Sequence, residues 1–401
     1  MNQTELLESF KCEDWHREIR ELALADAEKV KFPTGQAEKW KYSPIHKLSL
    51  DEFQMVATPS SQSKNPSYSN FIELVDGHLL SEAHSDKYEV TRLNHRNQPY
   101  DFNTPSDFFA QLNTALSPDP VLVHIPKQTQ ISKPIIIHNS ASAQSGMSFP
   151  KLHVHVGDAA SVQIVEIFES DDVRALSIPE TRIEIGSDAN VKYQQIQANQ
   201  SQVWQLGRLD IHVGKQSEFD GATVGLGGDY SRMETTCSLH GRGASATLSA
   251  IYLGDDEQTL DYRTYQEHIG KNTQSNLLFK GVLDDKASSI YTGLIRVHKE
   301  ASGTNAYQTN RTIKLSEDTW AESVPNLEIE NNDVRCSHAS TVSPVDDDQR
   351  FYLESRGIPT ESVDRLIVQG FLNEVVQKLP IESVNESILN MLLEKQQRGH
   401  S

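Results

Sequence analysis

Apolar and polar positions follow three successive patterns along this chain. Residues 4–30 place an apolar side chain about every 3.6 positions, which predicts an amphipathic helix with Thr4 as its N-cap. From residue 121 to residue 345, short runs alternate apolar and polar positions, as β-strands with one buried face do. The helical period returns from Asp346 onward. The pattern therefore predicts a mainly β protein whose strand-rich centre is flanked by helices.

Glycine-containing turns repeat inside the strand-rich centre. Gly157, Gly186, Gly214 and Gly241 are 29, 28 and 27 residues apart, and we expect the next interval to be irregular and to end at the turn of residues 283–289. A period of this length, made of short strands without intervening helices, is typical of a stacked solenoid. The repeat predicts a right-handed parallel β-helix of about eight coils, in which neighbouring coils supply one another's core.

The three patterns divide the chain into domains. We expect an N-terminal mainly helical domain of residues 1–118, a parallel β-helix core of residues 119–345 and a C-terminal helical domain of residues 346–401. In the first domain, Asp76 and Gly77 stand between two apolar runs, which predicts a hairpin over residues 71–80.

Two amphipathic helices, separated by Pro380, are expected in the C-terminal domain. Thr360 can cap the first of them. Such helices either cover the end of a β-helix or offer a groove to another protein. The first helix gathers its apolar residues into one stripe, made of Val363, Leu366, Ile367, Phe371, Val375 and Leu379.

The charge balance narrows the class of partner. The chain has 37 Lys and Arg residues against 56 Asp and Glu residues, a formal net charge of -19, and it has no basic run. Nucleic acids and anionic membrane surfaces attract clustered positive charge, so we expect neither as a partner. The sequence shows neither a secretory signal pattern nor an apolar run long enough to span a membrane, so we expect a cytoplasmic protein.

The cysteines carry the most informative chemistry. Cys12, Cys237 and Cys336 lie far apart without CxxC spacing, so neither a disulfide framework nor a zinc knuckle is indicated. Cys336 stands two residues before His338 in a strand-like run, which places both side chains on one face. Such a pair is a candidate site for a soft metal or for sulfur. Taken alone, however, the two residues favour a buried thiol beside a hydrogen-bonded histidine.

Other constellations favour ordinary structure. Residues 270–273 lack the glycine spacing and residue order of a phosphate-binding loop, so any nucleotide is expected on a partner. The acidic runs 346–348 and 255–257 could belong to a β-helix carbohydrate-active enzyme, but the first stands at a helix start and the second in a turn. His153 and His155 read as surface or core histidines, and Cys237 as a buried apolar residue.

Residues 331–358 resemble a known C-terminal signature. The run begins with Asn331 and Asn332, passes through Cys336-Ser337-His338 and ends in Ser355-Arg356-Gly357-Ile358, as in the SufB/SufD family of scaffold subunits for bacterial iron–sulfur cluster assembly. A second run, from Pro33-Thr34 through Trp40-Lys41-Tyr42, resembles the start of SufD-type members. SufB carries an essential cysteine in the strand before the Asn-Asn turn, where this chain has residues 318–321, Asp-Thr-Trp-Ala. The resemblance is therefore closest to SufD.

The resemblance implies a role inside a SufBCD complex rather than a stand-alone enzyme. In that family a SufB rod and a SufD rod pair end to end, and a transient iron–sulfur cluster forms at their junction. By motif, His338 would ligate iron and Cys336 would be a second ligand or a support. ATP would bind only the partner ATPase, SufC, and a reduced flavin is implied for the complex. The residues expected to dock SufC are Val363, Ile367, Phe371, Val375 and Leu379.

Several alternatives remain open from the sequence. The chain could be a SufB-like sibling, a secreted-type β-helix carbohydrate-active enzyme, or a self-associating structural β-solenoid without metal chemistry. An isolated SufD-type chain could also form a homodimer. Each alternative shares the same predicted fold, so the fold alone does not separate them.

Overall fold

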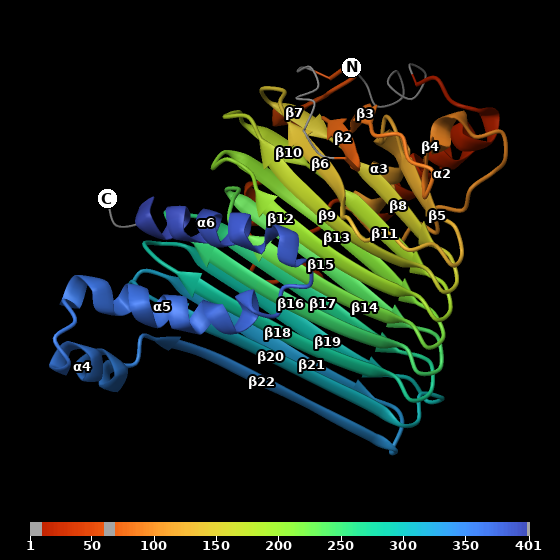
Figure 1. Ribbon diagram of the computed structural model, residues 1–401. Helices are drawn as coiled ribbons and strands as arrows, with labels where there is room; N and C mark the ends of the chain where they lie inside the picture. Colours follow the sequence, from red (N-terminus) through yellow and green to blue (C-terminus); the bar gives the residue numbers. More distant parts are fainter. Residues whose placement is uncertain (1–9, 60–68, 399–401) are drawn as a thin grey trace.

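The chain is wound into a long solenoid built from two β-sheets (Figure 1). The structure is a computed structural model that describes residues 10–59 and 69–398. Sheet A is parallel except at its first strand. In spatial order it contains β21 (Trp320–Ile329), β19 (Ser288–Val297), β17 (Thr259–His268), β15 (Tyr230–Leu239), β13 (Val203–Val213), β11 (Glu180–Ile185), β8 (Lys151–Val156), β5 (Val121–Ile125) and β4 (Glu89–Arg92), with the short strands β1 (Gln54–Met55), β7 (Gly146–Ser148) and β10 (Ala175–Ser177) beside this path.

Sheet B forms the second wall of the solenoid. It is parallel except for a hairpin at its first edge. In spatial order it contains β22 (Val334–Pro344), β20 (Thr304–Lys314), β18 (Gln274–Leu283), β16 (Ser245–Gly254), β14 (Glu218–Gly225), β12 (Asn190–Ala198), β9 (Ser161–Ser170), β6 (Ile135–Ala141), β2 (Phe71–Val75) and β3 (His78–Glu82).

Each coil contributes one strand to each sheet. A strand therefore pairs with the strands of the preceding and following coils, as Cys237 of β15 does with Ile211 of β13 and Gln266 of β17. About eight such coils are stacked. The prediction of a mainly β parallel solenoid flanked by helices is confirmed.

The glycine repeat marks the same corner in five successive coils. A Cβ on Gly214 would lie 2.6 Å from the carbonyl oxygen of Ile185, and a Cβ on Gly241 would lie 2.1 Å from the Lys215 nitrogen of the preceding coil. Only glycine allows so close a backbone approach. The series continues at Gly270, whereas residues 283–289 turn at the opposite corner, between β18 and β19. The expected irregular fourth interval was therefore wrong, because two different corners were read as one series.

The solenoid interior is a stack of side chains in register. Burying one aliphatic side chain of this kind contributes about 1.5–3 kcal/mol, so the stack is a major source of stability. The stack is aliphatic near the N-terminal end and becomes polar at its sixth member. Reading through sheet A, it consists of Val123, Val154, Ile183, Ile211, Cys237, Gln266 and Ile295.

The N-terminal region both caps the solenoid and adds strands to it. Hairpin β2–β3 turns at Asp76 and Gly77, as predicted, and β2 continues sheet B by pairing with β6. Strand β4 closes sheet A by running antiparallel to β5. The described part of this region is thus less helical than expected, because reversed strands terminate both sheets.

The helices of the N-terminal region are α2 (Asp14–Val30) and α3 (Phe108–Leu116), with short 3-10 turns at Glu38–Trp40, Ile45–Lys47, Leu50–Glu52 and Leu93–His95. The expected cap Thr4 lies outside the described residues.

Three helices follow the last strand. They are α4 (Asp347–Ser355), α5 (Thr360–Val376) and α6 (Glu382–Arg398), and Figure 1 shows α5 and α6 lying across the solenoid. The apolar sides of α5 and α6 pack on the outer face of sheet B, where Val368, Leu372 and Ile388 join one buried cluster with strand residues. Thr360 is the first residue of α5 and makes no capping hydrogen bond, because Pro359 occupies the N-cap position.

Candidate functional site

The C-terminal end of the solenoid is an uncovered edge. Strand β22 ends sheet B and pairs with β20, and β21 ends sheet A and pairs with β19. Most residues of β22 are exposed. Within residues 10–59 and 69–398, no strand pairs with the outer edge of β21 or β22. Free N–H and C=O groups along such an edge can pair with a strand of another chain.

Cys336 and His338 lie on this edge strand. Cys336 is half-buried, and it packs against an aliphatic cluster at the mouth of the solenoid that contains Ile295 and Ala306. Ser340, two residues beyond His338, hydrogen-bonds the hydroxyl of Ser323 in β21 at 2.6 Å. Because side chains alternate along a strand, the face that holds Cys336, His338 and Ser340 is the one turned toward sheet A. The structure thus brings the two predicted residues onto one face, with His338 exposed.

The local environment keeps the Cys336 thiol protonated. Burial raises the pKa of Cys336 above its ordinary value, and a hydrogen bond with the Ala306 backbone opposes part of that rise. A protonated thiol is a weak nucleophile, but a metal ion can displace its proton on binding. Among the described residues, no group of three or more His, Cys, Asp and Glu side chains is arranged to hold a metal ion. Cys336 and His338 can therefore supply two ligands, and others would have to come from a second molecule.

Gln308 is a further polar residue at this end that sequence reasoning missed. It lies in β20, in register with His338, and is 2% exposed. Neither its side-chain oxygen nor its nitrogen has a hydrogen-bond partner. Gly293 leaves room for the amide, since a Cβ there would lie 2.3 Å from the Gln308 nitrogen. Burying an amide without hydrogen-bond partners costs free energy, so Gln308 is a weak point in the packing of this end of the solenoid.

The other histidines and cysteines singled out in the sequence lie apart from this edge. His153 is buried and shares a hydrogen bond of 3.0 Å with the Tyr100 hydroxyl, whereas His155 is exposed. Cys237 lies inside the solenoid, where burial raises its thiol pKa to about 12. These positions agree with a structural role for His153 and Cys237.

The acidic runs are likewise engaged in local structure. Asp346 is the N-cap of α4, and its carboxylate accepts hydrogen bonds from the backbone N–H groups of Asp348 and Gln349. Asp255 forms an ion pair with Lys395 of α6. Both runs therefore serve helix capping or helix attachment, as the sequence favoured.

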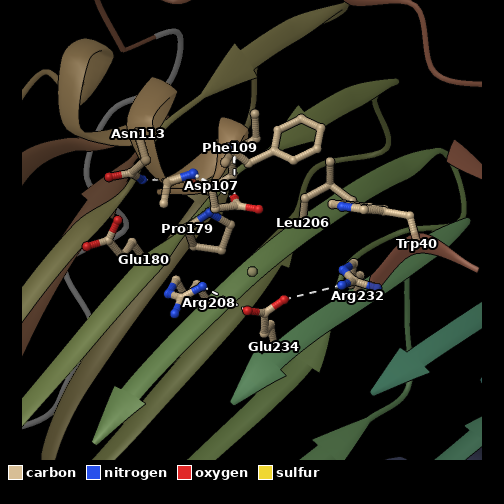
Figure 2. A pocket seen from close by; sticks show the side chains of 13 residues that line it. Trp40, Asp107, Phe109, Asn113, Pro179, Glu180, Leu206, Arg208, Arg232 and Glu234 are labelled. Carbon is tan, nitrogen blue, oxygen red and sulfur yellow. Dashed lines mark hydrogen bonds and ion pairs between the residues drawn. The ribbon is translucent and has the colours of Figure 1, made fainter. Parts of the chain in front are cut away.

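A charged pocket lies between the N-terminal segment and sheet A (Figure 2). Its volume of about 30 Å³ matches about one water molecule. Arg208 and Arg232 flank Glu234 on its floor, at 2.8 and 3.3 Å, and the Arg232 guanidinium lies 4.1 Å from the centre of the Trp40 ring. The pocket is thus a buried ion-pair network that fastens the N-terminal segment to the solenoid, and it is too small for an organic substrate.

Comparison with known proteins identifies the family of this fold. Residues 137–371 match the family model described as SUF system FeS cluster assembly, SufBD core domain. The chain belongs to the SufB/SufD family. It is 24% identical to the iron–sulfur cluster assembly protein SufD of Escherichia coli over 89% of this chain and 88% of that protein. It is 32% identical to SufD of Bacillus subtilis over 71% and 66% of the two chains. A SufBD family protein of Mycobacterium tuberculosis is 28% identical over 93% and 91%.

In this SufB/SufD family member, most of the predicted docking stripe on α5 is occupied internally. Val363, Val375 and Leu379 are 0%, 0% and 5% exposed, so a partner cannot reach them without moving α5. Ile367 and Phe371 are half-buried and remain accessible. They line one side of a groove with a volume of about 890 Å³, whose other walls include Arg311, Thr341, Tyr352, Leu353 and Leu366.

Sequence periodicity marked the apolar side of α5 but not what covers it. The outer face of sheet B is itself apolar, and α5 packs against it through Val368 and Leu372. Lys280 of β18 then fixes the helix, donating to the Phe371 carbonyl at 2.7 Å and pairing with Glu374 at 2.6 Å. In the described part of the chain, no helix is long and apolar enough to cross a membrane.

Proposed function

We propose that this chain is the SufD-type scaffold subunit of a SufBCD complex. Its open edge would pair with a SufB-like chain, and a nascent iron–sulfur cluster would form as cargo at the junction. The observation that carries the proposal is the pair Cys336 and His338 on β22, the edge strand at the C-terminal end of sheet B. Residues 318–321, which have no cysteine, support the SufD rather than the SufB assignment.

The two side chains suit this cargo chemically. Thiolate and imidazole both ligate iron in clusters. Because the Cys336 thiol is protonated at rest, it would lose its proton only when iron arrives. The missing ligands would come from the SufB-like partner, so neither chain would hold a cluster alone. The unpartnered amide of Gln308 would then hydrogen-bond His338 or a group of the partner.

The groove beside α5 is the proposed docking surface for the ATPase partner, SufC. Ile367 and Phe371 give it an accessible apolar wall, and Tyr352, which is 56% exposed, gives it an aromatic rim. ATP would bind to that partner. Because Lys280 ties α5 to β18, a movement of α5 would be transmitted to the coils next to the open edge.

The proposal assigns no stand-alone catalysis to the chain. The buried pocket of Figure 2 holds ion pairs rather than a substrate, and the acidic runs cap or fasten helices. The described cysteines are free thiols, which supports action in a reducing cytoplasm.

The proposal is tested by cluster formation in the purified complex. Iron, sulfide and visible absorbance are measured after anaerobic reconstitution of the wild-type complex and of a complex with Cys336→Ala and His338→Ala together. We expect the double variant to hold at least about tenfold less cluster. Ser337→Ala, on the opposite face of the same strand, is the matched control and should leave the content unchanged. Equal cluster content in the wild type and the double variant would overturn the proposal.

A further inference from the structure

Histidines and carboxylates form a row on the outer face of sheet A, away from the open edge. His124 of β5, His155 of β8, Glu184 of β11 and His212 of β13 are successive partners in the sheet register. These strands lie side by side in the half of the solenoid nearer the N-terminal cap (Figure 1). His240, directly after β15, extends the row toward the middle of the solenoid. The assembly of clusters at β22 makes no use of this row.

Four of these histidines form two close pairs. The Nδ1 atoms of His124 and His155 are 3.0 Å apart, and their rings are stacked with centroids 5.0 Å apart. Nδ1 of His212 lies 3.1 Å from Nε2 of His240, with centroids 5.3 Å apart. His155 and His240 are exposed. The same arrangement thus occurs twice on one face, at two different coils.

The surroundings lower the pKa of three of these imidazoles, those of His124, His212 and His240. Burial, followed by the neighbouring His155, lowers the pKa of His124. Burial, followed by Arg182, lowers that of His212, and burial followed by His298 lowers that of His240. A neutral imidazole offers one nitrogen lone pair, which is the form that ligates a metal. Each close N···N contact is a hydrogen bond, in which one ring nitrogen carries the proton and the other accepts it. When the donor imidazole instead carries its proton on its other ring nitrogen, the two facing nitrogens offer lone pairs at a spacing that one ion can bridge.

We propose that each pair, His124 with His155 and His212 with His240, chelates a divalent first-row transition metal ion. With metal–nitrogen bonds of about 2.0–2.1 Å, nitrogen atoms separated by 3.0 and 3.1 Å subtend about 95° at the ion. That angle fits the tetragonal geometry of Cu²⁺ or Ni²⁺ better than a tetrahedral zinc site. Cu²⁺ also stands highest in the affinity order of divalent ions for nitrogen ligands.

Water completes the coordination in both sites. Glu184, between the two pairs in the register, is engaged in an ion pair with Arg182 at 2.8 Å. On the far side of His240, Glu267 is paired with His298 at 2.8 Å. This agrees with the lack of a preassembled group of three ligands among the described residues. Two protein ligands make the sites open and exchangeable, unlike closed structural metal sites.

The test is titration of the full chain with Cu²⁺, followed by electron paramagnetic resonance and calorimetry. The Cys336→Ala, His338→Ala background removes the edge pair, so that its ligands do not contribute. We expect one ion per pair and a nitrogen hyperfine pattern from two imidazoles. His155→Gln and His240→Gln, each at an exposed position, should each weaken one ion by at least about tenfold and leave the other unchanged.

The matched control is His46→Gln, an exposed histidine in the short helix Ile45–Lys47, which should retain both ions. Melting of the metal-free variants checks that each one is folded. Two results would overturn the proposal: ion binding that neither pair variant changes, and a copper spectrum with a single imidazole nitrogen. Since the edge pair is absent from this background, neither result bears on the proposed role in cluster assembly.

Discussion

The two ends of the solenoid are built in opposite ways. At the N-terminal end, the reversed strands β3 and β4 terminate the two sheets, and α2 and α3 pack with Phe149, Leu176 and Leu206 in one buried cluster. At the C-terminal end, β21 and β22 are uncovered, and apolar side chains such as Ile329 and Val342 are 44% and 38% exposed. A stack of coils has unpaired strand edges at each of its two ends. A chain that covers only one end leaves the other free to pair with a second chain. The difference supports the proposal that this chain pairs with its partner through the C-terminal end.

The largest expected effect is at the closed end. Arg20 of α2 is 1% exposed and donates to the carbonyl oxygens of Ala115 and Ser117 at 2.7 and 2.6 Å. Arg20→Ala leaves those buried acceptors unsatisfied and opens a cavity, so we expect it to lower the free energy of unfolding by about 4 kcal/mol. Urea unfolding measures the loss.

Arg335→Ala is the matched change at the open end. Arg335 is exposed on β22, so its loss should change the free energy of unfolding by less than about 0.5 kcal/mol. Similar losses for Arg20→Ala and Arg335→Ala would contradict the contrast between a packed end and an unpacked one.

A smaller effect concerns a buried carboxyl group in the early coils. Glu166 of β9 accepts hydrogen bonds from Asn139, Thr181 and Tyr193, and burial raises its pKa from 4.5 to about 7. Because the folded-state pKa exceeds the unfolded one, the folded protein binds more protons between these values. Its stability should therefore fall as pH rises from about 5 to about 7 and then level off, by about 3 kcal/mol in total.

Glu166→Gln should remove this slope, as measured by urea unfolding across the same pH range. Glu257→Gln, at an exposed glutamate, is the control and should keep it. A wild-type protein with flat stability over that range would show that Glu166 is not held neutral by burial.

A still smaller effect than that of Glu166 is expected at two buried amides. Among the described residues, neither side-chain polar atom of Gln308 has a hydrogen-bond partner. The Gln194 nitrogen also lacks one, but its oxygen accepts from the backbone N–H of Ile381 at 3.3 Å. Gln308→Leu should stabilise the isolated chain by about 1 kcal/mol, and Gln194→Leu should destabilise it by a similar amount. Thermal melting reports both changes.

Gln308→Leu should also lower the cluster content of the complex, since the amide is proposed to serve His338 or the partner. A Gln308→Leu variant that is less stable than the wild type, in a complex with unchanged cluster content, would contradict the proposed role of this amide.

The fold was predictable because its repeat is local. Glycines such as Gly214 are required where one coil's backbone touches the next, so their spacing reports the coil length directly. The shared face of Cys336 and His338 follows in the same way from strand alternation. These features depend on residues close together in the sequence.

Features that depend on which side chains meet across neighbouring coils were not predictable. His124 and His155 are 31 residues apart and meet only because their strands are in register. Gln308 is notable only for the hydrogen bonds it lacks, which no sequence pattern shows. The apolar stripe of α5 is evident from the sequence. The apolar outer face of sheet B that buries Val375 exists only in the folded structure, where the strands lie side by side.

The most direct test of the central claim is native mass spectrometry of the tagged chain, isolated anaerobically from its own cells. The account predicts a complex that contains one SufB-like chain and a pair of ATPase subunits, together with iron and sulfide. Val342→Lys, which places a charge on the open edge strand, should release the SufB-like chain while leaving the Tm of the isolated subunit unchanged. Recovery of the wild-type chain alone, without iron, sulfide or partners, would contradict the account.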